Sequence, residues 1–74
     1  MPAKKGNAVY KLIEIVGTST TSFADAARNG VKTASRTLRD LRVAEVEQLD
    51  IKIDNGKLLY RAKLKVSFKY HGED

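Results

Sequence analysis

The chain contains no cysteine and no tryptophan, and it has a single proline and a single histidine. Without cysteine it can form neither a disulfide bridge nor a thiolate metal site, and one histidine cannot build a zinc cluster. No apolar run is long enough for a membrane span or a secretory signal. We therefore expect a cytoplasmic protein without a membrane partner.

The chain is also short, with 74 residues. A domain of this size buries only about 60% of the surface that its unfolded chain exposes. Its core is therefore marginal and usually needs additional stabilisation, such as a cross-link, a ligand or a subunit contact. Since disulfides and zinc are excluded, the remaining sources of additional stability are self-association and a bound ligand. We expect an oligomer, and the net charge of +5 favours anionic partners at long range.

The composition indicates one domain between two short ends. Residues 1–7, with two lysines, are interpreted as a flexible arm. Residues 8–70 carry the regular apolar patterns and form the predicted domain, and residues 71–74 form a tail. His71 lies in this tail and is not expected to be catalytic.

The clearest pattern lies near the end of the chain. From Tyr60 to Tyr70 every even position is apolar, whereas the odd positions include the four basic residues Arg61, Lys63, Lys65 and Lys69. Side chains alternate faces along a strand, so this pattern predicts a strand with one apolar and one cationic face. Asn55-Gly56 just before it is the preferred centre of a type I′ turn, which predicts a hairpin.

Earlier segments complete a β-α-β-β order. Val9–Val16 is nearly continuous in apolar character, as in a strand covered on much of both faces, and Gly17–Ser22 is interpreted as a polar loop. Ser22 and Asp25 resemble a capping box. An apolar stripe at helical spacing then predicts a helix from Phe23 to about Leu41. Its members are Phe23, Ala26, Ala27, Val31, Ala34, Leu38 and Leu41.

Residues 43–54 predict the remaining strand, with a bulge where the apolar spacing changes between Val46 and Leu49. The predicted fold class is α+β. Three antiparallel strands form one sheet, in which the first strand pairs with the free edge of the last one, and the single amphipathic helix packs across one face. Such a sheet leaves two open edges, which invite partners.

The charged residues leave several interpretations open. Arg61, Lys63 and Lys65 can line an anion pocket, because guanidinium groups bind carboxylate or phosphate bidentately, or they can form a solvated face paired with Glu45 and Glu47. Five carboxylates offer calcium ligands if an assembly shares them between subunits. They are Glu14, Glu45, Glu47, Asp50 and Asp54, of which Glu14 and Asp50 are our metal candidates.

A basic stripe is predicted on the helix, formed by Arg28, Lys32, Arg36 and Arg39. It suits an anionic partner or salt bridges between subunits. No aromatic residue interleaves with it to stack bases, so a nucleic-acid function is not favoured. The Gly17–Ser22 segment before the helix is a second, weaker candidate for anion binding. No nucleophile has an identifiable base, and we predict no enzymatic activity.

Taken together, these residues resemble a known family, the dodecins. The resemblance covers about residues 8–70 and includes Tyr10–Ser19 (YKLIEIVGTS), the helix end Ala34–Arg39, Glu45-Val46 and Lys65–Phe68. It implies a hollow homododecamer of cubic symmetry that stores a flavin, riboflavin or FMN, between aromatic side chains at a two-fold axis. Such an assembly would provide the additional stability that a short chain needs.

The resemblance also implies where the ligand site lies and how this chain departs from it. Val43 occupies the place of the family's stacking tryptophan, and Arg61 that of its hydrogen-bonding glutamine. An aliphatic side chain offers no stacking surface, so we expect weak or absent riboflavin binding and a preference for a small anionic or flavin-like ligand. The ligand-binding candidates are Val43, Glu45, Arg61 and Lys63.

Residues 51–68 are more similar to the calcium dodecin subgroup, whose members are sometimes labelled protein transport proteins. The function expected from the resemblance is non-catalytic storage of a small ligand. A calcium-binding shell or transport-associated protein, and an anionic-partner module acting through the basic helix, are the alternatives.

Overall fold

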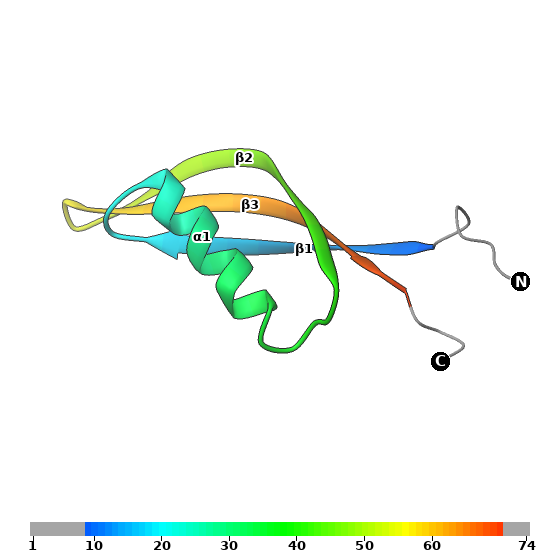
Figure 1. Ribbon diagram of the computed structural model, residues 1–74. Helices are drawn as coiled ribbons and strands as arrows, with labels where there is room; N and C mark the ends of the chain where they lie inside the picture. The colour runs from blue at the N-terminus through cyan, green and yellow to red at the C-terminus, as the bar shows by residue number, and fades with distance from the viewer. Residues whose placement is uncertain (1–8, 71–74) are drawn as a thin grey trace, which may run out of the picture.

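The computed structural model describes residues 9–70 and contains one helix and three strands (Figure 1). They follow in the order β1 (Tyr10–Ser19), α1 (Phe23–Ala34), β2 (Leu41–Asp54) and β3 (Lys57–Lys69). The β-α-β-β prediction is confirmed. The predicted arm at residues 1–7 and the tail at residues 71–74, including His71, lie outside the described residues.

The strands form one antiparallel sheet in the order β1-β3-β2, so β3 is central and both other strands are edges (Figure 1). Tyr10 of β1 lies opposite Lys69 of β3, which places the start of β1 beside the end of β3. The β2–β3 pairing shifts between Val46 and Gln48, where the sequence predicts a bulge, and again between Leu41 and Val43. The predicted strand order and the predicted bulge are both confirmed.

The hairpin between β2 and β3 turns at Asn55-Gly56. Their φ angles are 52° and 78°, the two positive values that a type I′ turn requires. Asp54 and Lys57 pair directly on either side of the turn. The predicted hairpin is therefore present, and it aligns the long β2 and β3 strands.

The helix α1 begins as predicted, because Ser22 is its N-cap. The backbone N–H of Asp25 donates to Ser22 Oγ at 3.0 Å. The Asp25 carboxylate, which also favours the positive end of the helix, accepts a hydrogen bond from the Ser19 hydroxyl at 2.7 Å. Ser19 belongs to β1, so the predicted loop at Gly17–Ser22 begins later than expected, after Ser19.

The helix ends at Ala34, so the prediction that it continues to about Leu41 is wrong. After Ala34 the N–H groups of Arg36 and Thr37 bond to carbonyls three residues back, which tightens the turn and stops the α-helix. The Ser35 hydroxyl also donates to the Lys32 carbonyl at 2.8 Å, a local bond that competes with helical hydrogen bonding. Asp40 has a φ of 56°, and Leu41 already begins β2.

The core lies between α1 and the sheet. The even positions of β3 supply Ala62, Leu64 and Val66, which are buried as predicted, and α1 supplies Ala26. Leu64 and Val66 are the only large side chains among the described residues with less than 2% of their surface exposed. The core of a single chain is therefore thin.

Two glycines let α1 lie directly on β1. A Cβ added at Gly17 would overlap the backbone carbonyl oxygen of Ala26, and one added at Gly30 would lie 2.9 Å from Leu64 Cδ1. Because both positions lack a Cβ, the helix and the sheet can lie in close contact there. This contact, which the sequence prediction of a loop at Gly17 missed, fixes the position of α1 over β1 and β3.

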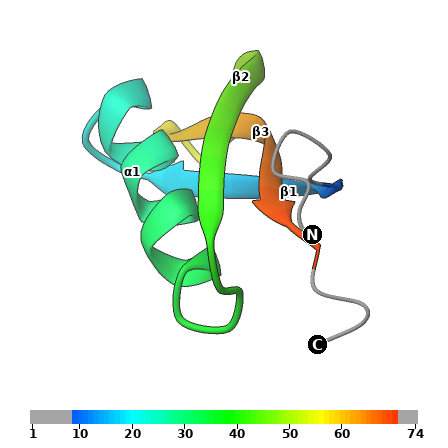
Figure 2. The same cartoon turned by 45° about the vertical axis from the view of Figure 1, so that its right-hand side comes forward.

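The helix leaves much apolar surface uncovered. In the turned view of Figure 2, α1 lies to one side of β2. On the face of β1 away from α1, Leu12 is 57% and Val16 54% exposed, so the expectation that β1 is covered on both faces is wrong for a single chain. No helix among the described residues is long and apolar enough to cross a membrane.

Candidate functional site

The face of the sheet opposite α1, here called the open face, carries all six residues that the sequence proposes as site residues. The register places Glu14 and Glu45 on either side of Lys65, and Asp50 opposite Arg61. Lys63 follows on the same face of β3, and Val43 lies opposite Ser67. Strand alternation, together with the bulge between Val46 and Gln48 that brings Asp50 to the same face as Glu45, therefore places residues that are far apart in the sequence on one face.

The Arg61–Asp50 pair has the best geometry on this face. Arg61 Nε donates to Asp50 Oδ1 at 2.6 Å and Nη2 donates to Oδ2 at 2.9 Å, a bidentate contact. The hydrogen bond from Arg61 lowers the pKa of Asp50, and the same bond raises the pKa of Arg61. Glu45 and Glu47, the predicted partners of the cationic face, do not pair with Arg61, because the bulge after Val46 shifts the register and brings Asp50 opposite Arg61.

Lys65 lies among three carboxylates. Its Nζ is 3.1 Å from Glu47 Oε2, and the charges of Glu14 and Glu45 also act on it. The hydrogen bond with Lys65 lowers the pKa of Glu47, and the hydrogen bond with Glu47 raises the pKa of Lys65. The predicted pairing of the cationic strand face with Glu47 is confirmed.

Lys63 is held more loosely than its neighbours. Its Nζ lies 3.9 Å from Glu14 Oε1, at the limit of an ion pair, and both side chains are about half exposed. Each cation at the centre of the open face therefore has a carboxylate partner, but Lys63 is the one most easily drawn away by a ligand.

A hollow of about 300 Å³ lies on the open face, at the small end of ligand pockets. Its lining consists of Val16, Gln48, Asp50, Arg61 and Lys63. The arrangement offers hydrogen-bond donors, one apolar wall and no nucleophile beside a base. Val16 and Gln48 were missed as site residues. The alternation of β1 carries the signal for Val16, whereas Gln48 reaches this face through the bulge after Val46.

The two metal candidates do not meet within one chain. Glu14 is on β1 and Asp50 on β2, the two edge strands, which β3 separates by about 10 Å. No group of three or more histidine, aspartate or glutamate side chains within residues 9–70 is arranged to hold a metal ion. Glu14 and Asp50 therefore do not share one metal site within residues 9–70 of a single chain.

The basic stripe is shorter than predicted. Arg28 and Lys32 belong to α1, but the helix ends before Arg36 and Arg39, so these two do not continue a helical row. Arg28 Nη1 lies 3.2 Å from Asp25 Oδ1, which reduces its availability to an anionic partner. The prediction of a four-residue helical stripe is wrong in this respect.

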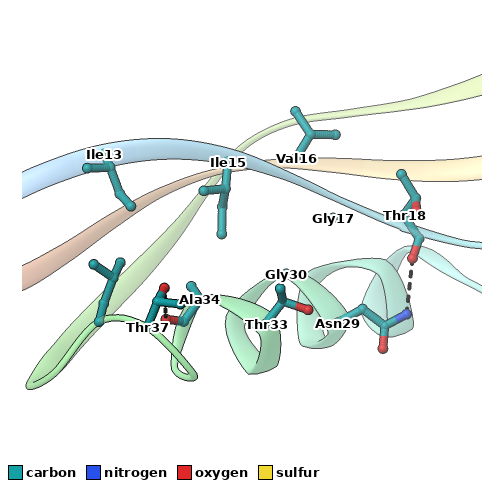
Figure 3. Close-up of a pocket in the computed structure, with 11 residues that line it drawn as sticks. Ile13, Ile15, Val16, Gly17, Thr18, Asn29, Gly30, Thr33, Ala34 and Thr37 are labelled. Atoms are coloured by element: carbon teal, nitrogen blue, oxygen red, sulfur yellow. Dashed lines mark hydrogen bonds between the residues drawn. The ribbon is translucent and has the colours of Figure 1, made fainter.

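A second depression, here called the groove, lies between the free edge of β1 and α1 and measures about 460 Å³ (Figure 3). Ile13 and Ile15 point into it from β1, while Thr33 and Thr37 border it on the other side (Figure 3). The sequence did not single out this groove, because it depends on how closely Gly17 and Gly30 let the helix approach the strand.

The fold and the site pattern can be compared with known proteins. The family model for dodecin matches residues 9–71, which is nearly the whole chain. The chain belongs to the dodecin family.

Individual dodecins support this assignment at the level of sequence and structure. The chain is 50% identical over 62 residues to the calcium dodecin of Mycobacterium tuberculosis, covering 82% of this chain and 87% of that protein. The crystal structure of that dodecin, a calcium-chelating antigen with a novel calcium-binding site, has a TM-score of 0.81 at 46% identity and covers 89% of this chain and 96% of its own. The predicted similarity to calcium dodecin is therefore confirmed.

A dodecin from Streptomyces coelicolor is also similar, with a TM-score of 0.86 and 36% sequence identity. The match covers 93% of this chain and 100% of the Streptomyces chain. The β-α-β-β fold is thus shared over nearly the whole length of these two solved dodecin chains.

Proposed function

We propose that this dodecin is a non-catalytic homododecameric protein that stores a small ligand at the open face of its sheet. The observation that carries the proposal is that Arg61 and Lys63 line the hollow on that face, which Val43 and Glu45 share. Family membership supports storage in an assembly. The thin core supports it independently, because a chain that fully buries so few large side chains gains stability from partners.

The open face is poorly suited to stacking a flavin in a single chain. Val43 is 61% exposed and has no planar surface. The Nε and Nη2 groups of Arg61 already donate hydrogen bonds to Asp50. Lys63 is the cation that an acidic ligand meets with least competition. We therefore infer a small ligand with an anionic group and expect weak binding of neutral riboflavin.

Fluorescence titration with riboflavin and FMN tests this inference. The unmodified protein should quench riboflavin weakly, and Val43→Trp combined with Arg61→Gln should bind it about 5- to 150-fold more tightly, because stacking on a planar ring is worth about 1–3 kcal/mol. Val43→Leu with Arg61→Gln is the matched control without an aromatic ring. Tight riboflavin binding by the unmodified chain, or equal affinity in the tryptophan and leucine variants, would contradict the assigned site.

Calcium binding is a second candidate, favoured by the identity to calcium dodecin and by the carboxylates on the open face. Because Glu14 and Asp50 are too far apart within one chain, the ion would bind between chains. Isothermal titration of the assembled protein should then show calcium binding that magnesium does not reproduce and that Glu14→Gln or Asp50→Asn weakens. Equal heats for calcium in all three proteins would exclude this site.

A further inference from the structure

Another depression of the open face, here called the hairpin pocket, lies beside the β2–β3 turn and measures about 220 Å³. Its lining consists of Thr20, Lys52, Asp54, Lys57, Leu58 and Leu59. Lys52 pairs with Leu59 and Asp54 with Lys57, at odd positions of β3 that share a face with Arg61 and Lys63. The hollow and the hairpin pocket therefore follow one another along the same face of the sheet.

We propose that the ligand stored at the open face is elongated and carries an anionic group at each end. One anionic group binds in the hollow and the other in the hairpin pocket. This inference rests on the proposed function and specifies its class of ligand, a molecule with two anionic ends and an uncharged middle.

The hairpin pocket has the charge that a second anionic group requires. Its lining contains two ammonium groups, from Lys52 and Lys57, and a single carboxylate, from Asp54. Neither lysine makes an ion pair with another residue in the range 9–70. Because an ammonium group binds carboxylate or phosphate as a compact charge with three donors, both lysines can hold a ligand anion.

The segment between the two anion positions is electrically balanced. Arg61 lies between Lys63 and Leu59 on the same face of β3, and its bidentate bond to Asp50 pairs the two charges. Val16 lines the hollow, and Leu59 lines the hairpin pocket, so apolar side chains lie on either side of this pair. The middle of the ligand is therefore expected to be uncharged.

The strand register sets the length of the ligand. Lys52 lies opposite Leu59, whereas the cation of the hollow, Lys63, lies four residues further along β3. Residues of a strand are about 3.3 Å apart, so the two cationic positions are about 13 Å apart along the sheet. A ligand with one anionic group, or with two that are close together, reaches only one of these positions.

Linear dicarboxylates of different length are probes for this arrangement. Dodecanedioate, when extended, is long enough to reach both positions, whereas adipate is too short. In isothermal titration of the assembled protein, dodecanedioate should bind about two- to fivefold more tightly than its monomethyl ester, the gain expected from one exposed charge pair. Adipate should bind no more tightly than its own monomethyl ester.

Variants of Lys52 test which residue supplies the gain. Lys52→Gln should remove the advantage of dodecanedioate over its ester, and Lys52→Arg, which keeps the charge, should retain most of it. Lys32→Gln is the matched control, because it removes one exposed cation from α1 on the other side of the sheet. Circular dichroism checks that the variants fold, and the comparison of the ligands on the unmodified protein requires no variant.

The outcomes separate this inference from the proposed function. If none of the four ligands binds, the anionic site of the proposed function is wrong, and this inference falls with it. If the esters bind and the dicarboxylates bind no better, the proposed site stands and the elongated ligand is wrong. Equal affinity of Lys52→Gln and Lys32→Gln for dodecanedioate would exclude the hairpin pocket as the second anion position.

Discussion

Gly17 shows how much one missing side chain contributes to this fold. It faces α1 from β1, and an added Cβ would overlap the carbonyl oxygen of Ala26, which is backbone and cannot rotate away. Gly17→Ala should therefore lower the free energy of unfolding by about 1–3 kcal/mol, the usual range for overpacking. Urea denaturation measures the change, with the exposed neighbour Thr18→Ala as the control. Similar stability of the two variants would show that α1 does not lie as closely on β1.

The ion pairs of the open face predict a pH dependence. The pKa values of Asp50 and Glu47 are lowered in the folded protein by hydrogen bonds from Arg61 and Lys65. These carboxylates therefore stabilise the fold above their unfolded pKa of about 4, and this contribution is lost as the pH falls through the lower folded pKa.

The melting temperature should accordingly fall below about pH 4 and fall less steeply in Asp50→Asn combined with Glu47→Gln. The effect is small because both pairs are exposed, and high salt should reduce it further. Differential scanning fluorimetry across the pH range measures it. An identical acid profile in the double variant would mean that these pairs contribute nothing to stability.

The β2–β3 hairpin depends on backbone conformation more than on packing. Gly56 has a φ of 78°, and a Cβ added there would have no heavy atom within 4 Å. A substitution at Gly56 therefore tests the backbone conformation of the turn and not its packing. Gly56→Val should destabilise the protein by about 1–3 kcal/mol, because a β-branched residue is strained at positive φ. Gly56→Asn, which tolerates this region, is the control and should lose less. Thermal denaturation compares the two variants, and equal melting temperatures would place the turn elsewhere.

The end of α1 shows where sequence periodicity misleads. Leu38 and Leu41 continue the helical spacing, yet Ser35 and Thr37 bond to backbone carbonyls and the chain turns before both leucines. Leu38 then contributes to the groove and Leu41 packs against the core from β2. Both leucines are partly buried on the helix side of the sheet, but from different elements.

The whole molecule has more apolar surface than one helix can cover. Its sheet has two free edges, and exposed aliphatic side chains lie on both of its faces. An assembly that buries these surfaces stabilises the chain by mass action. The melting temperature should therefore rise with protein concentration until the assembly is saturated, and native mass spectrometry should find the dodecamer. A concentration-independent melting temperature together with a monomer mass would contradict the assembly.

The sequence by itself determined the elements whose signals are local. The alternation of β3, the Asn55-Gly56 turn and the Ser22 cap each depend on a few neighbouring residues, and all three appear as predicted. The shared face of Arg61 and Lys63 follows from the same alternation. The resemblance to dodecins was likewise carried by short motifs spread over the whole chain, which the family match confirms.

Only the tertiary structure decided which side chains pair and which surfaces remain open. Arg61 bonds to Asp50 because a bulge shifts the register of β2 relative to β3. Which residues then lie opposite each other depends on the backbone geometry of both strands. The groove exists because Gly17 and Gly30, distant in sequence, let α1 approach β1. Such contacts join residues from separate elements, and local sequence preferences do not specify the distances between them.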